Sequence, residues 1–419
     1  MKILMVNKFL HPNGGSETYI FKLGEQLQKM GHEVQYFGME NEGRIVGNHA
    51  EVYTSDMDFH AGGFKKLLYP LHIIYSTEAK GKMRRVLEDF EPDVVHLNNI
   101  NFQLTPSVIY AVRAYEKKHG RKIRIVYTAH DYQWVCPNHM MRIPSTGEIC
   151  FACRGGDYVQ CSKNRCIHNS RVKSLLGTIE AKYYAKRQTY GLVDVIVCPS
   201  EFMKKRLDTN PLLADKTVVM HNFIDADAMK RAETACGTDT GQDTVQKSAM
   251  RHDGRDYVVY FGRFSEEKGT KTLLDACRAL QDIPFVFAGT GPLEDKVNEV
   301  ANVENRGFVT GEALRKLVSR ARFSVYPSEW YENCPFSVME SQMYGTPVLV
   351  SDLGGAPELV QAGKTGELFR GGNVEELTEH IRALWNNPEL CRQYSENCKE
   401  INFDTVREYC DKIVRKVYA

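Results

Sequence analysis

Residues 2–31 read KILMVNKFLHPNGGSETYIFKLGEQLQKMG and combine an apolar strand, a glycine turn and an amphipathic helix. The strand is the run Lys2–Val6, the turn is 13–15, and Ser16 is the expected N-cap of the helix. Apolar residues then recur at helical spacing until Gly31 ends the helix, namely Tyr19, Ile20, Leu23, Leu27 and Met30. This strand–turn–helix order is typical of the start of a parallel α/β sheet.

The same alternation continues along the chain and starts again in its second half. Further strands are expected at 34–37, 94–97, 123–127, 195–198, 257–261, 285–288, 323–326 and 348–350. Helical patterns separate them, so each half is expected to form a parallel sheet covered by helices on both faces. We therefore predict an α/β protein with two doubly wound, Rossmann-like domains facing a cleft. Ligands of such sheets bind beyond the carboxyl ends of the strands.

Shifts in composition along the chain indicate where these domains begin and end. The first domain is expected at 1–222, with a cysteine-rich insertion at about 136–168. Residues 223–256 contain few large apolar side chains and form an expected linker or surface insertion. The second domain is expected at 257–395, and a C-terminal helix at 396–419 is expected to pack back on the first domain.

The 419 residues carry 54 Lys and Arg against 53 Asp and Glu, a formal net charge of +1. This balance argues against a nucleic-acid-binding protein, which usually has a strong basic excess. The first apolar run stops at Asn7-Lys8, well short of a signal peptide. No stretch reaches the roughly 20 apolar residues that a membrane helix needs. We expect a cytoplasmic protein whose thiols are reduced.

Two loops that follow expected strands carry residues suited to binding an anion. Gly14 and Gly15 allow a ligand to approach the backbone closely, although a plain tight turn explains them equally well. In the second half, Arg263 and Lys268 flank a loop that opens a helix. Two cations beside a helix N-terminus suit a diphosphate, and a solvated loop paired with neighbouring glutamates is the alternative.

A third loop, residues 327–340 (PSEWYENCPFSVME), leads into a helix that begins at Pro335. Glu332 is expected just before this helix, and Glu340 about one and a half turns inside it. Apolar residues surround Glu340 in the sequence, and a carboxylate in such a setting is costly unless it binds a partner. A capped or exposed acid is the alternative for Glu340 taken alone.

Together these motifs resemble the family 4 glycosyltransferases, which have the GT-B fold. Glu332 and Glu340 match the E-x7-E motif of that family. Further segments match in the right order over nearly the whole chain, at 13–15, 262–263 with 268–269, 327–328, 344–348 and 351–358. One departure is Asn333-Cys334-Pro335, where the family often has Gly-Phe-Gly, so the pattern does not define the donor sugar.

The resemblance implies a metal-independent, retaining hexosyltransferase that moves a sugar from a nucleotide-diphosphate donor to a saccharide or lipid-linked acceptor. Such reactions build cell-surface polysaccharide, lipopolysaccharide or glycolipid. No cofactor is required for catalysis by this analogy, because side-chain cations and helix amides stabilise the leaving group. Two alternatives are an epimerase-like enzyme that acts on nucleotide sugars with the same fold, and a non-enzymatic, zinc-containing interaction protein.

The resemblance also implies roles for single residues. Arg263 and Lys268 would hold the diphosphate, helped by the amides of Phe336 and Ser337. Glu340 would hydrogen-bond the donor ribose, and Glu332 the hydroxyls of the donor sugar.

Three further sites follow from the same analogy. Gly15 would approach the diphosphate or the acceptor, and Phe308 and Val309 would lie near the base. His130, which follows the strand at 123–127, resembles the cleft histidine of the family. It would position and polarise the transferred sugar, so His130 and Glu332 are the expected catalytic residues.

Five of the chain's 12 cysteines fall within residues 136–166. Four of them, Cys150, Cys153, Cys161 and Cys166, supply the ligand count of a structural zinc knuckle. Their irregular spacing leaves disulfide or redox chemistry and a loosely packed loop as alternatives, whereas an iron–sulfur centre has no supporting feature. The insertion follows His130 directly, so we expect it to shape access of the acceptor.

The near-zero net charge conceals an asymmetry between the halves. Residues 1–200 carry 26 Lys and Arg against 19 Asp and Glu, whereas residues 201–419 carry 28 against 34. Basic residues of the first half concentrate at Lys65-Lys66, at 80–85 and at 163–187. Solvated helix faces explain these groups, and an anionic membrane surface is the functional alternative. The protein would then be peripheral on the cytoplasmic membrane.

Overall fold

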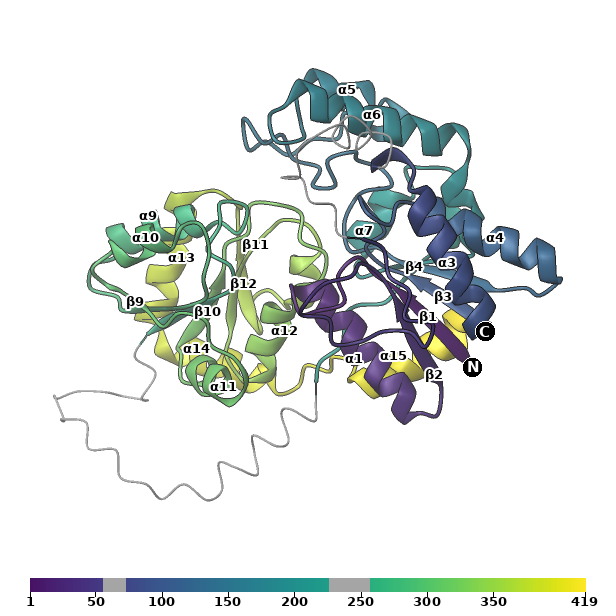
Figure 1. The fold of residues 1–419 in the computed structure, drawn as a ribbon. Coiled ribbons are helices and arrows are strands. Elements are labelled where there is room, and N and C mark those ends of the chain that lie inside the picture. The colour runs from purple at the N-terminus through teal and green to yellow at the C-terminus, as the bar shows by residue number, and fades with distance from the viewer. Residues whose placement is uncertain (56–72, 226–256) are drawn as a thin grey trace. The chain divides into compact units, whose positions relative to one another are not determined.

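The computed structural model describes residues 1–55, 73–225 and 257–419, and Figure 1 shows its ribbon. The chain forms two compact units, one of Met1–Asn222 with Val406–Ala419 and the other of Phe223–Thr405. Most of the expected linker at 223–256 and the basic pair Lys65-Lys66 lie outside the described residues. Each unit is built on its own parallel sheet.

The first unit contains a six-stranded parallel sheet in the order β2-β1-β3-β4-β5-β6. Its strands are β1 (Lys2–Val6), β2 (Glu33–Phe37), β3 (Val94–Leu97), β4 (Arg124–Thr128), β5 (Val195–Cys198) and β6 (Thr217–Val219). The central strands are buried along almost their whole length, as their continuous apolar runs predict. The direction in which strands are added reverses between β1 and β3, which makes this the switch point where ligands of such sheets bind.

Helices cover both faces of this sheet. The helices of this unit are α1 (Gly15–Lys29), α3 (Thr77–Phe90), α4 (Ser107–His119), α5 (Val159–Lys163), α6 (Arg171–Lys186), α7 (Glu201–Leu207) and α15 (Val406–Ile413). Helix α1 packs against α15, and α3 packs against α4. The ribbon places these two pairs on opposite faces of the sheet (Figure 1), as right-handed crossovers on either side of a switch point require.

The start of α1 differs from the sequence prediction. The helix begins at Gly15 with Gly14 as N-cap, and no side chain caps it, so the prediction of Ser16 as N-cap is wrong. The Ser16 hydroxyl instead donates to the carboxylate of Glu17 (2.9 Å) and accepts from Asn99 Nδ2 (3.0 Å). The buried Glu17 carboxylate therefore competes successfully for the hydroxyl that a cap would use.

The second unit also contains a six-stranded parallel sheet, in the order β12-β11-β10-β7-β8-β9. Its strands are β7 (Val258–Phe261), β8 (Phe285–Ala288), β9 (Val303–Asn305), β10 (Phe323–Tyr326), β11 (Val348–Ser351) and β12 (Gly366–Phe369). This is the strand order of a Rossmann fold, with the switch point between β7 and β10. The sequence patterns predicted four of these strands but not the short edge strands β9 and β12.

The helices of the second unit are α9 (Thr270–Ala279), α10 (Glu294–Asn298), α11 (Gly311–Ser319), α12 (Phe336–Met343), α13 (Val374–Asn386) and α14 (Pro388–Cys398). Helix α12 has Pro335 as N-cap and no side-chain cap, so its first amides keep no partner from a capping side chain. Val338 and Met339 of this helix are buried against β10 and β11. Gly345 follows the helix with a φ of 72°, as expected for a terminating glycine.

The chain returns to the first unit at Val406, ten residues beyond the boundary at residue 396 that the sequence predicts. Helix α14 continues to Cys398 and buries Tyr394 and Cys398 in the second unit, which explains the later return. The returning α15 places the Tyr409 hydroxyl 2.9 Å from that of Tyr19. A turn of π-helix (Val414–Tyr418) follows it.

The cysteine-rich insertion lies between β4 and α6 and contains little regular structure. Its elements are one turn of 3-10 helix (Arg154–Gly156) and the single-turn helix α5. Its small core consists of Cys153, Tyr158, Cys161 and Cys166, backed by apolar residues of α6. A core of four side chains provides little hydrophobic burial to hold the insertion together.

Candidate functional site

The clearest polar cluster of the second unit lies at its switch point, in the loops that follow β7 and β10. Lys268 comes from the first loop and Glu332 from the second, and Lys268 Nζ lies 2.5 Å from Glu332 Oε1. The two loops also join through their backbones, because the amide of Glu329 donates to the carbonyl of Glu267 (2.9 Å). The fold thus brings together two predicted site residues that lie 64 positions apart.

Glu332 is held by several groups and is only 8% exposed. Its carboxylate accepts from Ser328 Oγ (3.1 Å) and from the indole of Trp330. Burial acts to raise the pKa of Glu332, but the charge of Lys268 and the hydrogen bonds from Lys268, Trp330 and Tyr326 outweigh it and lower the pKa. The carboxylate is therefore ionised at neutral pH.

The loop after β11 fixes the backbone of Glu332. The amide of Gly355 donates to the Glu332 carbonyl (2.6 Å), and a Cβ at Gly354 would lie 2.4 Å from the same oxygen. Gly354 also has a φ of 71°, which favours glycine. This close approach gives the glycines within residues 351–358 a structural role beside the site.

Glu340 lies on the helix that follows, in a different environment. Burial raises the pKa of its carboxyl. Within the described residues, no hydrogen bond or ion pair is recorded for this side chain. A partly buried carboxyl without a partner is costly, so Glu340 is free to bind a ligand hydroxyl.

The other predicted site residues of the second unit differ in whether they contact the Lys268–Glu332 pair. Ser337 is linked to Glu332 through the Tyr326 hydroxyl, which bonds both side chains. The ring of Phe336 packs edge-to-face against that of Phe223, with 6.2 Å between the ring centroids. Arg263 and Phe308 are exposed, and Val309 packs on the cluster beside β7 and β8. No recorded contact joins Arg263, Phe308 or Val309 to the Lys268–Glu332 pair in the described part of the chain.

At the switch point of the first unit, polar side chains follow β1, β3 and β4. Asn7 accepts from the amide of Asn99 (3.1 Å) and donates to the Glu17 carboxylate (3.0 Å). Gly15 is exposed at the start of α1, next to this network. His130 follows β4, and its Nε2 lies 2.9 Å from Asn98 Oδ1.

The environment of His130 determines its protonation. Burial lowers the pKa of His130 to about 4, although the charge of Asp131 acts in the opposite direction. The imidazole is therefore neutral at physiological pH. Because Asn98 Oδ1 only accepts hydrogen bonds, the proton of the neutral ring lies on Nε2, given the assigned orientation of the Asn98 amide. Asn98 thus sets the tautomer and the orientation of His130.

The sequence analysis assigns no individual role to Asn98, Ser328 or Trp330. Each lies within two residues of the end of a buried strand or of a predicted site residue, where polar or aromatic side chains are brought to the carboxyl edge of a sheet. That position in the sequence is a usable signal. Their hydrogen-bond partners, however, belong to other loops and follow only from the tertiary structure.

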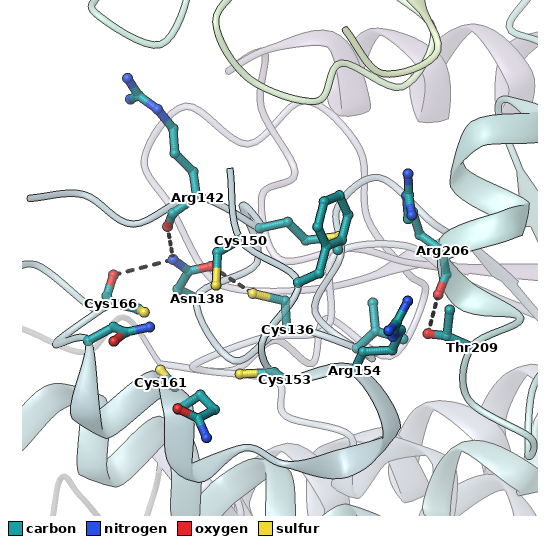
Figure 2. Close-up of a pocket in the computed structure, with 15 residues that line it drawn as sticks. Cys136, Asn138, Arg142, Cys150, Cys153, Arg154, Cys161, Cys166, Arg206 and Thr209 are labelled. Carbon is teal, nitrogen blue, oxygen red and sulfur yellow. Dashed lines mark hydrogen bonds between the residues drawn. The ribbon is translucent and has the colours of Figure 1, made fainter. Parts of the chain in front are cut away.

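All five cysteines of the insertion line one cavity of about 20 Å³, where Figure 2 shows their sulfur atoms turned toward a common space. Cys136 Sγ donates to Asn138 Oδ1 (2.8 Å), and Asn138 Nδ2 donates to the carbonyl of Arg142 (2.6 Å). All five are free thiols. As placed, no three His, Cys, Asp or Glu side chains of the described residues meet the spacing of a metal site.

Comparison with known proteins identifies the family. The profile "Glycosyltransferase Family 4" matches residues 13–228, more than half of the chain, and "Glycosyl transferases group 1" matches residues 242–401. The chain belongs to glycosyltransferase family 4. This confirms the family that the sequence motifs resemble.

Relatives and solved structures agree with this assignment. An uncharacterised glycosyltransferase of Methanocaldococcus jannaschii is 28% identical over 259 residues, which span 60% of this chain and 66% of that protein. Alpha-maltose-1-phosphate synthase of Mycolicibacterium smegmatis is 27% identical over 277 residues, spanning 59% of this chain and 70% of the relative.

Among solved structures, Anabaena HepE in complex with UDP has a TM-score of 0.62 at 18% identity, covering 99% of both chains. Sucrose-phosphate synthase of Thermosynechococcus elongatus has a TM-score of 0.66 at 15% identity, covering 99% of this chain and 97% of that one. These likenesses, with the two parallel sheets, confirm the predicted GT-B fold.

Proposed function

We propose that this protein is a retaining hexosyltransferase that takes a sugar from a nucleotide-diphosphate donor. The observation that carries the proposal is the Lys268–Glu332 pair at the switch point of the second unit, in a chain of glycosyltransferase family 4. Structures of HepE contain UDP and UDP-glucose, which supports a nucleotide sugar as donor. The bond from the anomeric carbon to the diphosphate breaks, the acceptor oxygen bonds to the same face, and the acceptor proton passes to the leaving diphosphate.

In this proposal, different residues of the second unit bind different parts of the donor. Lys268 and the exposed Arg263 bind the diphosphate and offset the charge that develops as it leaves, so the step needs no metal ion. The uncapped amides of Phe336 and Ser337 add to this stabilisation. Glu332 accepts hydrogen bonds from the sugar hydroxyls and Glu340 from the ribose, while Phe308 and Val309 contact the base.

The first unit supplies the remaining groups. His130, neutral at physiological pH, positions and polarises the transferred sugar through hydrogen bonds rather than by nucleophilic attack. Gly15 approaches the diphosphate or the acceptor at the uncapped start of α1. The acceptor is a saccharide or a lipid-linked saccharide of a cell-surface polysaccharide, lipopolysaccharide or glycolipid, and the enzyme works in the cytoplasm.

A thermal-shift panel of UDP-, GDP- and ADP-sugars tests the donor class. We expect one nucleotide-diphosphate sugar to raise the Tm by several degrees, since ligand at about 100 times its Kd adds about 2.7 kcal/mol to the free energy of unfolding. The matching nucleoside monophosphate is the control and should shift the Tm less, because it lacks the second phosphate. No shift with any donor would favour a non-enzymatic protein. Donor turnover without a glycosylated acceptor would favour an epimerase-like enzyme.

Helix α6 supports a lipid-linked acceptor held at an anionic membrane. Val172, Leu175 and Ile179 lie one helical turn apart on one face and are 70, 53 and 44% exposed. Exposed lysines accompany this stripe, and Glu180 is the helix's one acid. An apolar stripe on a basic helix suits an interfacial position on anionic lipid. In the described residues, every helix is too short or too polar to span a bilayer.

Flotation with vesicles of phosphatidylcholine and phosphatidylglycerol tests this position. We expect the protein to float with the vesicles at low salt and to be released at high salt, since the electrostatic part is screened. The double variant Leu175→Glu/Ile179→Glu should bind several-fold less. Ile45→Glu is the matched control, because Ile45 is 59% exposed on another segment of the same unit. Equal vesicle binding by the double variant and the Ile45→Glu control would contradict the proposal. So would a wild-type protein that does not bind the vesicles.

A further inference from the structure

We propose that the cavity of the cysteine-rich insertion binds one Zn²⁺ ion through four of the five cysteines that line it, Cys136, Cys150, Cys153, Cys161 and Cys166. The candidate donors include one more residue than sequence spacing predicts, because Cys136 also lines the cavity. This metal is structural and independent of the sugar-transfer step. It would hold the insertion in the conformation that Figure 2 shows.

The size and lining of the cavity suit a single thiophilic cation. Its volume of about 20 Å³ is just above the ~10–15 Å³ that one water molecule requires, so it accommodates one ion and no organic cofactor. Thiolate sulfur is the donor that zinc and other soft metals prefer. Five thiols around a space of this size therefore favour metal coordination over simple packing.

The charges around the cavity also favour a metal–thiolate centre. A zinc ion with four thiolates carries a net charge of −2. Among the described lining residues there are three arginines, Arg142, Arg154 and Arg206, and no Asp or Glu. The guanidinium of Arg206 lies 4.4 Å from the ring centroid of Phe151, which keeps it on the cavity wall. Basic surroundings of this kind offset the negative charge of the centre.

The backbone around the cavity can also support a thiolate. The amide of Ala152 donates to Cys150 Sγ (3.4 Å). Amide donors to sulfur orient metal-bound thiolates and stabilise their charge.

The insertion needs a stabilising element that its own core does not supply. Three of the four buried members of its core are cysteines. Five non-glycine residues in it or at its edge adopt positive φ angles, and each such residue costs about 1–2 kcal/mol: His139, Met141, Arg165, His168 and Asn169. A structural zinc site stabilises a loop of this kind, because metal binding contributes directly to folding. Binding would draw the sulfurs inward from their present positions to about 2.3 Å from the ion.

Metal analysis of the full-length protein, purified under reducing conditions without a metal-binding tag, tests the assignment. We expect about one zinc per chain by mass spectrometry of the metal content. After exchange for Co²⁺ we expect the sulfur-to-metal charge-transfer band and the visible bands of a tetrahedral thiolate site. Neither readout depends on a variant that might fail to fold. Less than about 0.2 zinc per chain together with no cobalt–thiolate band would overturn the proposal.

Serine variants then identify the ligands. The five single variants are Cys136→Ser, Cys150→Ser, Cys153→Ser, Cys161→Ser and Cys166→Ser. Four of them should each lose most of the bound zinc, and the fifth should keep it. Cys198→Ala, in the buried strand β5, is the matched control outside the cavity and should also keep it. Full zinc content in two or more of the five variants would overturn a site of four cysteine ligands. A native disulfide among these cysteines or a bound iron–sulfur chromophore would overturn the zinc assignment itself.

Discussion

Replacing Lys268 by alanine is expected to lower kcat/KM about 100- to 1000-fold, the loss typical of one preorganised electrostatic contact to a developing charge. In our proposal the ammonium group has two tasks. It binds the leaving diphosphate, and it keeps the buried Glu332 carboxylate ionised from 2.5 Å away. Steady-state kinetics with the donor identified by thermal shift measures the loss. Because the leaving-group charge grows in the transition state, kcat should fall more than KM rises.

The same substitution separates catalysis from stability through its pH dependence. Lys268 lowers the pKa of Glu332 against the effect of burial, so its removal should raise that pKa. The acidic limb of the pH profile of kcat/KM should then shift to higher pH. A carboxyl with a lowered pKa stabilises the fold above its unfolded pKa of about 4.3 and loses this contribution as the pH falls. Above that pH, the free energy of unfolding of Lys268→Ala should be about 3 kcal/mol lower than that of the wild type. This is the lower end of the range for a broken buried ion pair, because the Lys268 side chain is 25% exposed.

Lys271→Ala is the matched control for this prediction. Lys271 is an exposed residue of α9, the helix that follows the Lys268 loop, and its removal leaves Glu332 paired. Its kcat/KM should stay within about twofold of the wild type, since exposed charges contribute little. A Lys268→Ala variant that keeps kcat/KM within threefold of the control would contradict the role of Lys268 in the reaction.

Gly269→Ala is expected to lower the free energy of unfolding by about 2–5 kcal/mol. Gly269 has a φ of 69°, and a Cβ there would lie 1.8 Å from the carbonyl oxygen of Pro327. Left-handed backbone costs about 1–2 kcal/mol for alanine, and relieving a backbone clash costs about 1–3 kcal/mol more. The clash would also separate the loops after β7 and β10, so activity should fall by an order of magnitude or more as Lys268 and Glu332 move apart.

Gly363→Ala separates the two contributions. Gly363 has a similar φ of 75°, but nothing lies within 4 Å of the added Cβ. The Gly363→Ala variant should therefore lose only the cost of left-handed backbone, about 1–2 kcal/mol of the free energy of unfolding, and should keep its activity. Chemical denaturation of both variants gives the comparison. Equal losses at the two positions would show that the contact between the loops is absent in solution.

The sequence alone was sufficient for the strand–helix alternation, because continuous apolar runs and helical spacing are local patterns. It was also sufficient for the family, since the motifs at 13–15, 262–269 and 327–358 keep their order along the chain. Local patterns failed at α1, where the competition of Glu17 for the Ser16 hydroxyl depends on burial that no spacing reveals. They also missed the edge strands β9 and β12, which are short and only partly buried.

Which side chains meet was decided only by the tertiary structure. The pairing of Lys268 with Glu332 requires two loops that adjoin because β7 and β10 are neighbours in the sheet. The contact between Asn98 and His130 likewise joins the ends of β3 and β4, and the approach of Cys136 to the other four cysteines requires the insertion to fold back. Residue types and spacing determine the class of fold and reaction, because both rest on local pattern. Hydrogen bonds, pKa shifts and the proposed choice of metal ligands depend on distances between segments remote in sequence, and these exist only in the folded chain.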